Sequence, residues 1–166
     1  MVYEVKRKNN FEVEVDIPGS KSISNRALIL AVLNEKNTLL KNMLFSDDTR
    51  YMIEALKKLG NKIEVNEVEK TVFVIPNKER VWNTVELFVG NAGTAMRFLP
   101  TYIATGTGEV VLTGIERMKE RPIRDLVEAL EQVNVKIEYM EKDGFPPIKI
   151  IAKGLNGGKI KIKGDK

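Results

Sequence analysis

Four polar side chains surround the predicted start of a helix in the segment PGSKSISNR, residues 18–26. Lys21 and Asn25 lie four residues apart, as do Ser22 and Arg26, so each pair shares one helix face. A cation at the positive end of a helix dipole is disfavoured by about 0.3–1 kcal/mol unless solvent or an anion neutralises it. Free backbone N–H groups at the same end complete a receptor for phosphate or carboxylate. The alternative interpretation is a solvated helix start capped by serine.

Two further segments combine glycine or proline with positive charge. GNAGTAMR, residues 90–97, links a predicted buried strand to a helix, and its glycines allow backbone amides to approach an anion closely. RMKERP, residues 117–122, carries three cations ahead of a proline that suits the first turn of a helix. Each segment also has a plain structural interpretation: a tight strand-to-helix turn for the first, and a solvated charged loop for the second.

The composition narrows the chemistry that these segments can do. The 166 residues carry a formal net charge of +4 and have a pI near 9.2, which favours anionic partners. The sequence has no histidine and no cysteine, which excludes an imidazole base, a thiolate nucleophile, a disulfide and the usual zinc site. Proton transfer therefore falls to Lys, Asp, Glu or Tyr. The adjacent carboxylates Asp47 and Asp48 are explained by helix capping rather than by acid–base catalysis.

Nucleic acid and membranes are not expected partners. The single tryptophan, Trp82, and the four tyrosines form no stacking array interleaved with basic residues. The longest strongly apolar run, residues 27–33, is far shorter than the ~20 residues that span a bilayer, and the N-terminus has no signal-peptide pattern. We therefore expect a cytoplasmic protein that binds small anionic molecules.

The sequence contains an internal repeat. IEAL at 53–56 recurs as VEAL 74 residues later, and KIE at 62–64 recurs after the same interval. This offset also carries Gly19 of the first segment onto Gly93 of the second. Two glycine turns thus occupy equivalent places in two copies of one supersecondary unit.

Each copy is predicted to fold as a βαβαββ unit. In the first, at about residues 11–76, the alternation of FEVEVDI predicts a strand, and Ser20 caps a helix that runs to Leu33. After the strand NTLLKNML, a second helix starts at Ser46 and stops at Gly60, and a hairpin follows it. The buried face of this second helix is predicted to consist of four apolar residues: Met52, Ile53, Leu56 and Leu59.

The second unit, at about residues 84–152, repeats this order. Strand VELFV precedes a helix that starts near Thr94, and Pro100 is expected to kink or shorten that helix because it lacks a backbone donor. Strand GEVVLTG, a helix started by Pro122, and the strands VKIEYM and PPIKII complete the unit. The buried face of the later helix is predicted to be Ile123, Leu126, Val127 and Leu130.

A third unit is predicted to begin at about residues 158–166, where GGKIKIKGDK has the pattern of another opening strand. The sequence stops where the turn and first helix of that unit would follow. We therefore expect a mixed α/β (α+β) chain of two units and the first strand of a third, cut from something longer.

Four segments together resemble a known family. PGSKSISNRALIL, LFSDDTRYMIEAL, GNAGTAMRFL and LTGIERMKERPIRDLVEAL occur in this order and spacing in 5-enolpyruvylshikimate-3-phosphate (EPSP) synthases. The resemblance covers the chain from about Phe11 onward and corresponds to the N-terminal part, somewhat over a third, of such an enzyme. It implies the enolpyruvyl transferase fold, in which two lobes of three βαβαββ units enclose the substrates. Residues 1–166 would then form a partial N-terminal lobe.

The resemblance also implies a reaction. Members of the family transfer the enolpyruvyl group of phosphoenolpyruvate to the 5-hydroxyl of shikimate 3-phosphate, by addition and then elimination of phosphate, with no metal and no organic cofactor. Both substrates carry a phosphate and a carboxylate, and fixed cations in a closed cleft stabilise such charge. The missing C-terminal portion of the enzyme would be a partner. The isolated chain is expected to lack turnover and to be open to self-association through an uncovered face.

Individual roles follow from the same resemblance. Lys21 corresponds to the catalytic lysine that contacts both substrates, and Ser22 and Arg26 correspond to residues that bind shikimate 3-phosphate. The phosphoenolpyruvate site is carried over, together with Lys21, onto three residues: Asn91, Gly93 and Arg121.

One position departs from the family pattern, and two other functions stay open. Phe98 follows Arg97 where many members of the family carry proline, which leaves sensitivity to glyphosate undecided. The sister enzyme, UDP-N-acetylglucosamine enolpyruvyl transferase, shares the fold, but its usual cysteine in the KERP loop has no counterpart in this sequence. A non-catalytic anion-binding module built of two units is the second alternative.

Overall fold

The structure is a computed structural model that describes residues 2–4, 6–7, 12–15 and 17–162, and it confirms the mixed α/β class. The helices are α1 (Lys21–Leu33), α2 (Asp47–Lys58), α3 (Gly93–Ala104), α4 (Glu116–Lys119) and α5 (Arg124–Glu131). The strands are β1 (Thr38–Leu40), β2 (Lys62–Asn66), β3 (Thr71–Ile75), β4 (Val81–Phe88), β5 (Thr107–Thr113), β6 (Lys136–Tyr139) and β7 (Ile148–Lys153). Within the described part of the chain, no helix is long and apolar enough to cross a membrane.

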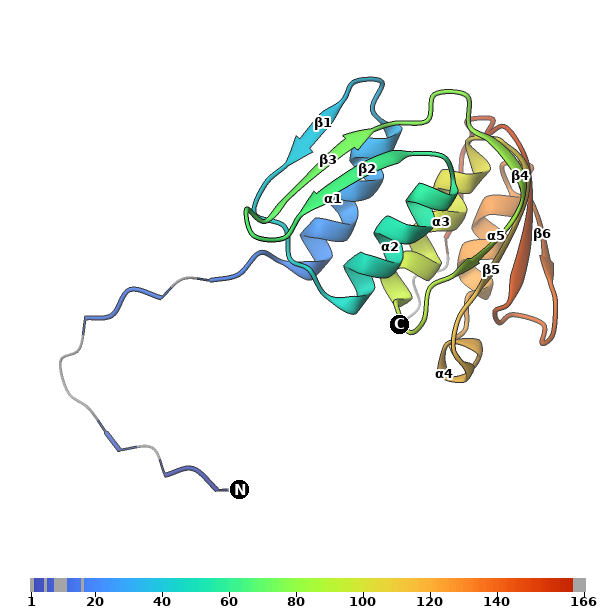
Figure 1. Ribbon diagram of the computed structural model, residues 1–166. Coiled ribbons are helices and arrows are strands. Elements are labelled where there is room, and N and C mark those ends of the chain that lie inside the picture. Colours follow the sequence, from blue (N-terminus) through green and yellow to red (C-terminus); the bar gives the residue numbers. More distant parts are fainter. Residues whose placement is uncertain (1, 5, 8–11, 16, 163–166) are drawn as a thin grey trace.

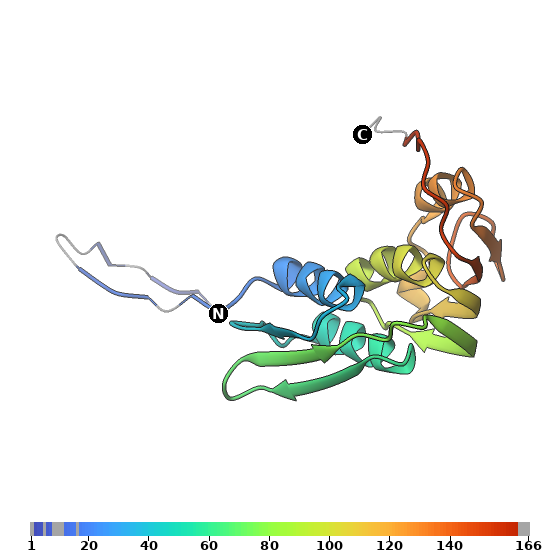
Figure 2. The ribbon, with the colours of Figure 1, turned by 90° about the horizontal axis from the view of Figure 1, so that it is seen from above.

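The strands form two sheets, and the order of the first sheet recurs in three strands of the second, β5-β7-β6. The first sheet has the order β1-β3-β2, and all of its pairs are antiparallel. The second has the order β4-β5-β7-β6, in which β4 runs parallel to β5 and the other pairs are antiparallel. Helices α1, α2 and α3 lie between the two sheets (Figure 1). Figure 2 shows α1 and α3 side by side, as their contacts require.

One hydrophobic core joins the two sheets and the helices between them. Leu28 on α1, Met52 on α2 and Leu99 on α3 are fully buried in the same cluster. Burial of each such side chain contributes roughly 1.5–3 kcal/mol to folding. Trp82 on β4 is buried as well, and its indole Nε1 donates a hydrogen bond of 2.9 Å to the Ile103 carbonyl on α3. This shared core fixes the loops of the second sheet relative to those of the first.

Capping residues predicted from the sequence begin both α1 and α2. Ser20 precedes α1, and its Oγ accepts a hydrogen bond from the Ile23 amide at 3.4 Å. Ser46 precedes α2, and its backbone N–H donates to the Thr49 Oγ1 at 2.8 Å. Gly60 follows α2 in the left-handed region with φ of 83°, as a terminating glycine does. The predicted apolar face of α2 is buried, and it consists of Met52, Ile53, Leu56 and Leu59.

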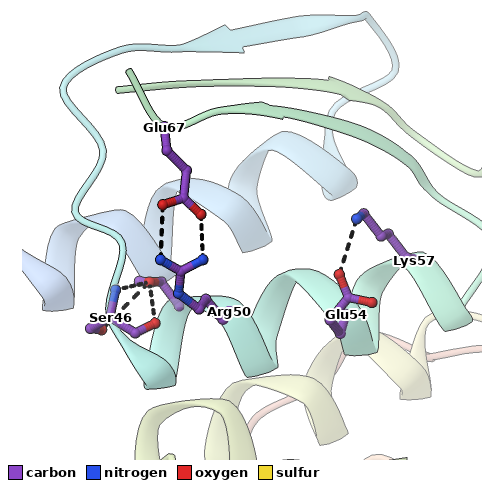
Figure 3. A network of polar contacts seen from close by, with 6 residues as sticks. Ser46, Arg50, Glu54, Lys57 and Glu67 are labelled. Atoms are coloured by element: carbon purple, nitrogen blue, oxygen red, sulfur yellow. Dashed lines mark hydrogen bonds and ion pairs between the residues drawn. The ribbon is translucent and has the colours of Figure 1, made fainter. Parts of the chain in front are cut away.

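An ion pair with two hydrogen bonds ties α2 to the first sheet. Both terminal nitrogens of Arg50 donate to the carboxylate of Glu67 in the β2–β3 turn, with Nη2 2.9 Å from Oε2 (Figure 3). The hydrogen bond from Arg50 lowers the pKa of Glu67 below its usual value of 4.5. Lys57 pairs with Glu54 at 3.0 Å on the same helix (Figure 3). The pair of Arg50 with Glu67 holds α2 against the first sheet, whereas the pair of Lys57 with Glu54 lies within the helix.

A buried polar network connects the two halves of the chain. The hydroxyl of Tyr102 on α3 donates to Asn61 Oδ1 at 3.1 Å, and the backbone N–H of Asn77 donates to the same oxygen at 2.9 Å. The Asn61 amide donates to the Leu56 carbonyl at 2.8 Å. Burial raises the pKa of Tyr102. The network joins the end of α2, the linker between the sheets and α3, which carries one edge of the site.

The strand predicted at residues 11–17 is wrong for the part that the structure describes. Residues 12–15 and 17 form no strand, while residues 11 and 16 lie outside the described residues. The side chains of Val13 and Val15 are exposed. In the second sheet β4 pairs with β5, and the matching edge in the first sheet is β1, which has three residues. Alternating apolar residues form a strand only beside a partner edge, and β1 offers few backbone groups for pairing.

The strand predicted at the start of a third unit, residues 158–166, is also not formed where it is described. Residues 158–162 have no strand geometry, and residues 163–166 lie outside the described residues. The backbone N–H of Lys161 donates to Gln132 Oε1 at 2.8 Å, and its carbonyl accepts from Gln132 Nε2 at 3.0 Å. A side chain that follows α5 therefore takes the backbone groups that a neighbouring strand would pair with.

Helix α3 continues through the buried Pro100 to Ala104, so the proline does not end the helix, and the kink expected there stays a prediction. The start of the later helix needs correction. Helix α5 starts at Arg124 rather than at Pro122. The Ile123 amide instead donates to the Gly144 carbonyl at 2.9 Å, which holds this residue outside the helix. The predicted buried face of α5 is confirmed for Ile123, Val127 and Leu130, and Leu126 is partly buried.

Candidate active site

A cavity of about 810 Å³ lies where α1, α2, the β4–α3 turn and the α4–α5 loop meet. Six residues were expected at the site, and all six line this cavity: Lys21, Ser22, Arg26, Asn91, Gly93 and Arg121. Eight further residues complete its lining, namely Asp47, Asp48, Tyr51, Gly90, Thr94, Arg97, Phe98 and Ile115. The structure therefore brings the three charged segments of the sequence to one place.

The first turn of α1 forms one wall of the cavity. Ser20 caps the helix, and the first turn contains no acidic residue that could neutralise the helix dipole. Lys21 and Ser22 lie in that turn and face the cavity, followed one turn later by Arg26. The Arg26 guanidinium donates from Nη1 to the Ser22 carbonyl at 3.0 Å. This wall thus presents two cations and a hydroxyl at the positive end of a helix.

Lys21 makes an ion pair across the cavity that the sequence analysis missed. Its Nζ lies 3.2 Å from Asp48 Oδ2 in the first turn of α2. Asp47 and Asp48 both line the cavity, so their position is not explained by helix capping alone. No local sequence signal connects two residues 27 positions apart on different helices. The pair holds the ammonium group of Lys21 toward the first turn of α2, and both residues line the cavity.

The β4–α3 turn forms the opposite wall, and its glycines allow close approach. Gly90 has φ of 55°, and a Cβ there would lie 2.4 Å from the Tyr51 ring. A Cβ on Gly93 would lie 2.5 Å from Arg121 Nη2, so the absence of a side chain lets the guanidinium lie against the start of α3. Arg121 Nη1 also donates to the Asn91 carbonyl at 3.5 Å. The turn therefore holds Arg121 beside the N-terminus of α3.

Neither a capping side chain nor an acidic residue of its first turn offsets the positive end of the α3 dipole. Its N-cap position is Ala92, which has no side-chain cap, and the first turn contains no acidic residue. The first backbone N–H groups of a helix lack intrahelical partners and carry partial positive charge. Together with Arg121, they form a receptor for an oxyanion.

Arg97 is a site residue that the sequence analysis noted but did not select. Its Nη1 donates to the Gly93 carbonyl at 3.1 Å and its Nη2 to the Pro122 carbonyl at 3.3 Å, so it bridges the turn and the loop. Burial lowers the pKa of Arg97, and the nearby charge of Arg121 lowers it further. Two guanidinium groups that repel each other gain free energy when an anion binds between them. Its spacing of four residues after Gly93 was the available signal.

The segment 117–122, which the sequence singled out, contributes one of its three cations, Arg121, to the cavity. Lys119 forms ion pairs with Glu116 at 3.2 Å and with Glu141 at 3.0 Å, and Arg117 is not part of the lining. Arg124, after the loop, pairs with Asp143 in the β6–β7 turn. The other two cations of the segment, Arg117 and Lys119, belong to α4 and are not part of the cavity lining.

The arrangement as a whole favours binding of small molecules with more than one negative charge. Four lining side chains are cationic, on α1, α3 and the α4–α5 loop, and two are carboxylates on α2. The cations divide between two walls, each of which also offers the N-terminus of a helix. Such a site suits two anionic groups bound side by side, one at each wall, although Asp48 already pairs with one of the cations, Lys21.

Comparison with known proteins adds the family. The family model for EPSP synthase (3-phosphoshikimate 1-carboxyvinyltransferase) matches residues 5–166. A 3-phosphoshikimate 1-carboxyvinyltransferase of Psychromonas ingrahamii is 50% identical over 156 residues, which cover 91% of this chain and 36% of the relative. One from Shewanella woodyi is 50% identical over 162 residues, covering 95% of this chain and 37% of the relative. The chain thus spans a little over a third of the length of these relatives.

The fold is shared with solved structures. EPSP synthase from Acinetobacter baumannii superposes with a TM-score of 0.77 at 24% identity, over 85% of this chain and 32% of that one. This likeness shows a common fold, and the match of the family model over residues 5–166 shows common descent. The chain belongs to the EPSP synthase family.

Proposed function

We propose that this chain supplies part of the substrate site for transfer of an enolpyruvyl group from phosphoenolpyruvate to the 5-hydroxyl of shikimate 3-phosphate, with release of phosphate. The observation that carries the proposal is the cavity, which collects four cations and two helix N-termini around one space. Both substrates have one phosphate and one carboxylate, so together they bring four anionic groups. A site with two positively charged walls suits this pair of ligands.

The α1 wall is assigned to shikimate 3-phosphate. Ser22 and Arg26 supply a hydroxyl and a guanidinium on the same helix face, which matches the donors that a phosphate monoester accepts. Lys21 lies between this wall and α2, where Asp48 fixes its ammonium group. We assign Lys21 to contact both substrates near the reacting hydroxyl.

The α3 wall is assigned to phosphoenolpyruvate. Arg121 lies against Gly93, and its Nη1 donates a hydrogen bond to the Asn91 carbonyl, which orients the guanidinium. The other N–H groups of the guanidinium make no hydrogen bond to the described residues and can bind phosphate oxygens. Arg97 braces the same turn from the other side. The backbone N–H groups at the start of α3 complete this half of the site.

The proposed reaction forms no covalent bond between the protein and its substrates. The 5-hydroxyl gives up its proton as its oxygen bonds to C2 of phosphoenolpyruvate, and C3 takes up a proton, which gives a tetrahedral intermediate. That intermediate then loses phosphate from C2 and a proton from C3, which leaves the enolpyruvyl ether. The fixed cations of this chain hold the anionic groups close together throughout, and their preorganisation lowers the barrier.

We further propose that turnover also requires groups from the part of the relatives that this chain does not span. The chain covers 36% of the Psychromonas ingrahamii relative, and the cavity is open to solvent. Catalysis of an addition and elimination needs opposed groups on both sides of the substrates. The 166 residues alone should bind substrates weakly and release no phosphate.

A chimera tests the proposed function. In it, this chain replaces the matching N-terminal portion of the Psychromonas ingrahamii relative, and phosphate release is measured with both substrates present. We expect release that depends on both substrates and that is abolished by Lys21→Met. Lys36→Met, which changes an exposed lysine outside the cavity lining, is the matched control and should leave release unchanged. A folded chimera without release would refute the proposal.

We also propose that the isolated chain self-associates through an exposed apolar face of α1. Ile23 and Leu30 lie seven residues apart on one face of this helix, and both are about two-thirds exposed, at 68% and 67%. We propose that a second copy covers this face, because contiguous exposed apolar residues favour association. Sedimentation at increasing concentration should show a dimer that Leu30→Gln removes. A wild-type chain that stays monomeric at high concentration would contradict this.

A further inference from the structure

Phe98 occupies a place in the cavity that no assigned role explains. It lies on α3, directly after Arg97, and its ring is partly buried against the hydrophobic core. Its other side lines the cavity. The ring is therefore held in position by the core while one surface faces the ligand space.

The exposed side of this ring meets Arg26 from α1. The guanidinium carbon of Arg26 lies 5.3 Å from the centre of the Phe98 ring. This distance is within the range of about 6 Å in which a cation is attracted to the face of an aromatic ring. The contact links α1, in the half of the chain with the first sheet, to α3, in the half with the second.

Arg26 has few other restraints. Its Nη1 donates to the Ser22 carbonyl at 3.0 Å, and among the described residues no carboxylate forms an ion pair with it. Asp48, a carboxylate in the same cavity, is paired with Lys21. The ring of Phe98 and one backbone carbonyl thus fix a long side chain that is otherwise exposed.

A ring is a suitable support for a guanidinium that must bind an oxyanion. A carboxylate partner would occupy the same N–H groups that the ligand's oxygens need, whereas a ring attracts the cation without accepting its hydrogen bonds in the guanidinium plane. An arginine held in its binding orientation loses less side-chain freedom when the ligand arrives. The contact with Phe98 therefore favours binding without competing for the donors.

We propose that Phe98 is a positioning residue, whose ring holds Arg26 over the cavity and thereby sets the affinity for shikimate 3-phosphate. This inference rests on the proposed function, because it takes shikimate 3-phosphate as the ligand of Arg26. It predicts an effect that is selective between the two substrates. Phosphoenolpyruvate, assigned to Arg121 on the other wall, should not respond to the loss of the ring.

The contact itself can be tested without any ligand. In the 166-residue chain, the Nε–Hε resonance of Arg26 should be displaced by the ring current of Phe98. Phe98→Leu, which keeps an apolar side chain against the core, should move this resonance toward the value of a free arginine. Phe98→Tyr, which keeps the ring, should leave it near the wild-type position. An Arg26 resonance that is unchanged in Phe98→Leu would overturn the proposal.

The effect on affinity is tested by titrating the same variants with shikimate 3-phosphate and with phosphoenolpyruvate, followed by amide chemical shifts. We expect Phe98→Leu to weaken binding of shikimate 3-phosphate roughly 2- to 5-fold and Phe98→Tyr to restore it. In an Arg26→Ala background, Phe98→Leu should have no further effect, because the ring then has no cation to hold.

The outcomes separate this inference from the proposed function. Equal weakening of both ligands by Phe98→Leu, or a loss that persists in Arg26→Ala, would show that Phe98 acts through the fold and would overturn the inference. If the wild-type chain binds neither ligand at any concentration, the proposed function fails and the affinity claim fails with it. The Arg26 resonance would still show whether the ring positions the guanidinium.

Discussion

Replacing Gly93 by alanine probes the packing of Arg121 against the start of α3. A Cβ at this position would lie 2.5 Å from Arg121 Nη2 and 2.6 Å from Nη1, and all three of its nearest atoms belong to that guanidinium. Ordinary contact with a Cβ begins at 3.4 Å, so the guanidinium must move by roughly 1 Å. The end of an arginine side chain can make this movement, and the backbone of α3 need not.

The expected cost falls on phosphoenolpyruvate. A displaced Arg121 loses a charge-assisted hydrogen bond to the phosphate, worth about 1.5–3 kcal/mol, which corresponds to roughly 10- to 100-fold in affinity. Shikimate 3-phosphate, on the α1 wall, should bind as it does to the wild type. The melting temperature should stay the same or rise slightly, because alanine is a better helix former than glycine.

Amide chemical-shift titrations of the 166-residue chain with each substrate measure this difference. Gly157→Ala is the matched control, because a Cβ there would meet nothing within 4 Å. If Gly93→Ala binds phosphoenolpyruvate as tightly as the control does, Arg121 is not the phosphate ligand and the assignment of the α3 wall is wrong. If both substrates weaken together and the melting temperature falls, the substitution disturbs the fold and the packing argument fails.

Two further predictions concern stability. Tyr102→Phe removes one of the two hydrogen bonds that the buried Asn61 Oδ1 accepts, and the bond from the Asn77 amide remains. Urea unfolding should therefore show that the free energy of unfolding falls by about 1 kcal/mol. An unchanged free energy of unfolding would contradict the network. Arg50 lowers the pKa of Glu67 below 4.5, so the folded state binds the proton less tightly than the unfolded state does. The stabilisation is therefore present above pH 4.5 and is lost as the pH falls through the lowered pKa. Glu67→Gln should melt below the wild type at neutral pH, and the two should converge in acid; a gap that persists in acid would show another cause.

The sequence predicted most of the local structure because the signals are local. Ser20 and Ser46 cap helices through their own first turns, and Gly60 ends α2 through its own backbone geometry. The apolar spacing of α2 gave its buried face for the same reason. The internal repeat predicts that the two glycine turns occupy equivalent positions in two units, and this stays a prediction.

The predictions that were wrong depended on neighbours. The alternation at residues 11–17 predicts a strand only if a long edge accepts it, and the three-residue β1 does not. The start of α5 was placed at Pro122, but the β6–β7 turn holds Ile123 through the Gly144 carbonyl.

Contacts across the cavity could not be obtained from the sequence. The pairing of Lys21 with Asp48, and of Arg26 with Phe98, joins residues on different helices with no common motif. Both contacts arise from how α1 packs on α2 and α3, which is a property of the tertiary structure. Side chains that tune a site are therefore the part of it that a motif leaves out.

A titration of the 166-residue chain with shikimate 3-phosphate and phosphoenolpyruvate together tests the central claim most directly. Unphosphorylated shikimate serves as the control ligand, and amide chemical shifts report where binding occurs. The account predicts saturable shifts confined to the cavity lining around Lys21, Asn91 and Gly93, with none around Arg80 in the linker between the sheets. Shifts that do not saturate, or that appear equally with unphosphorylated shikimate, would contradict it.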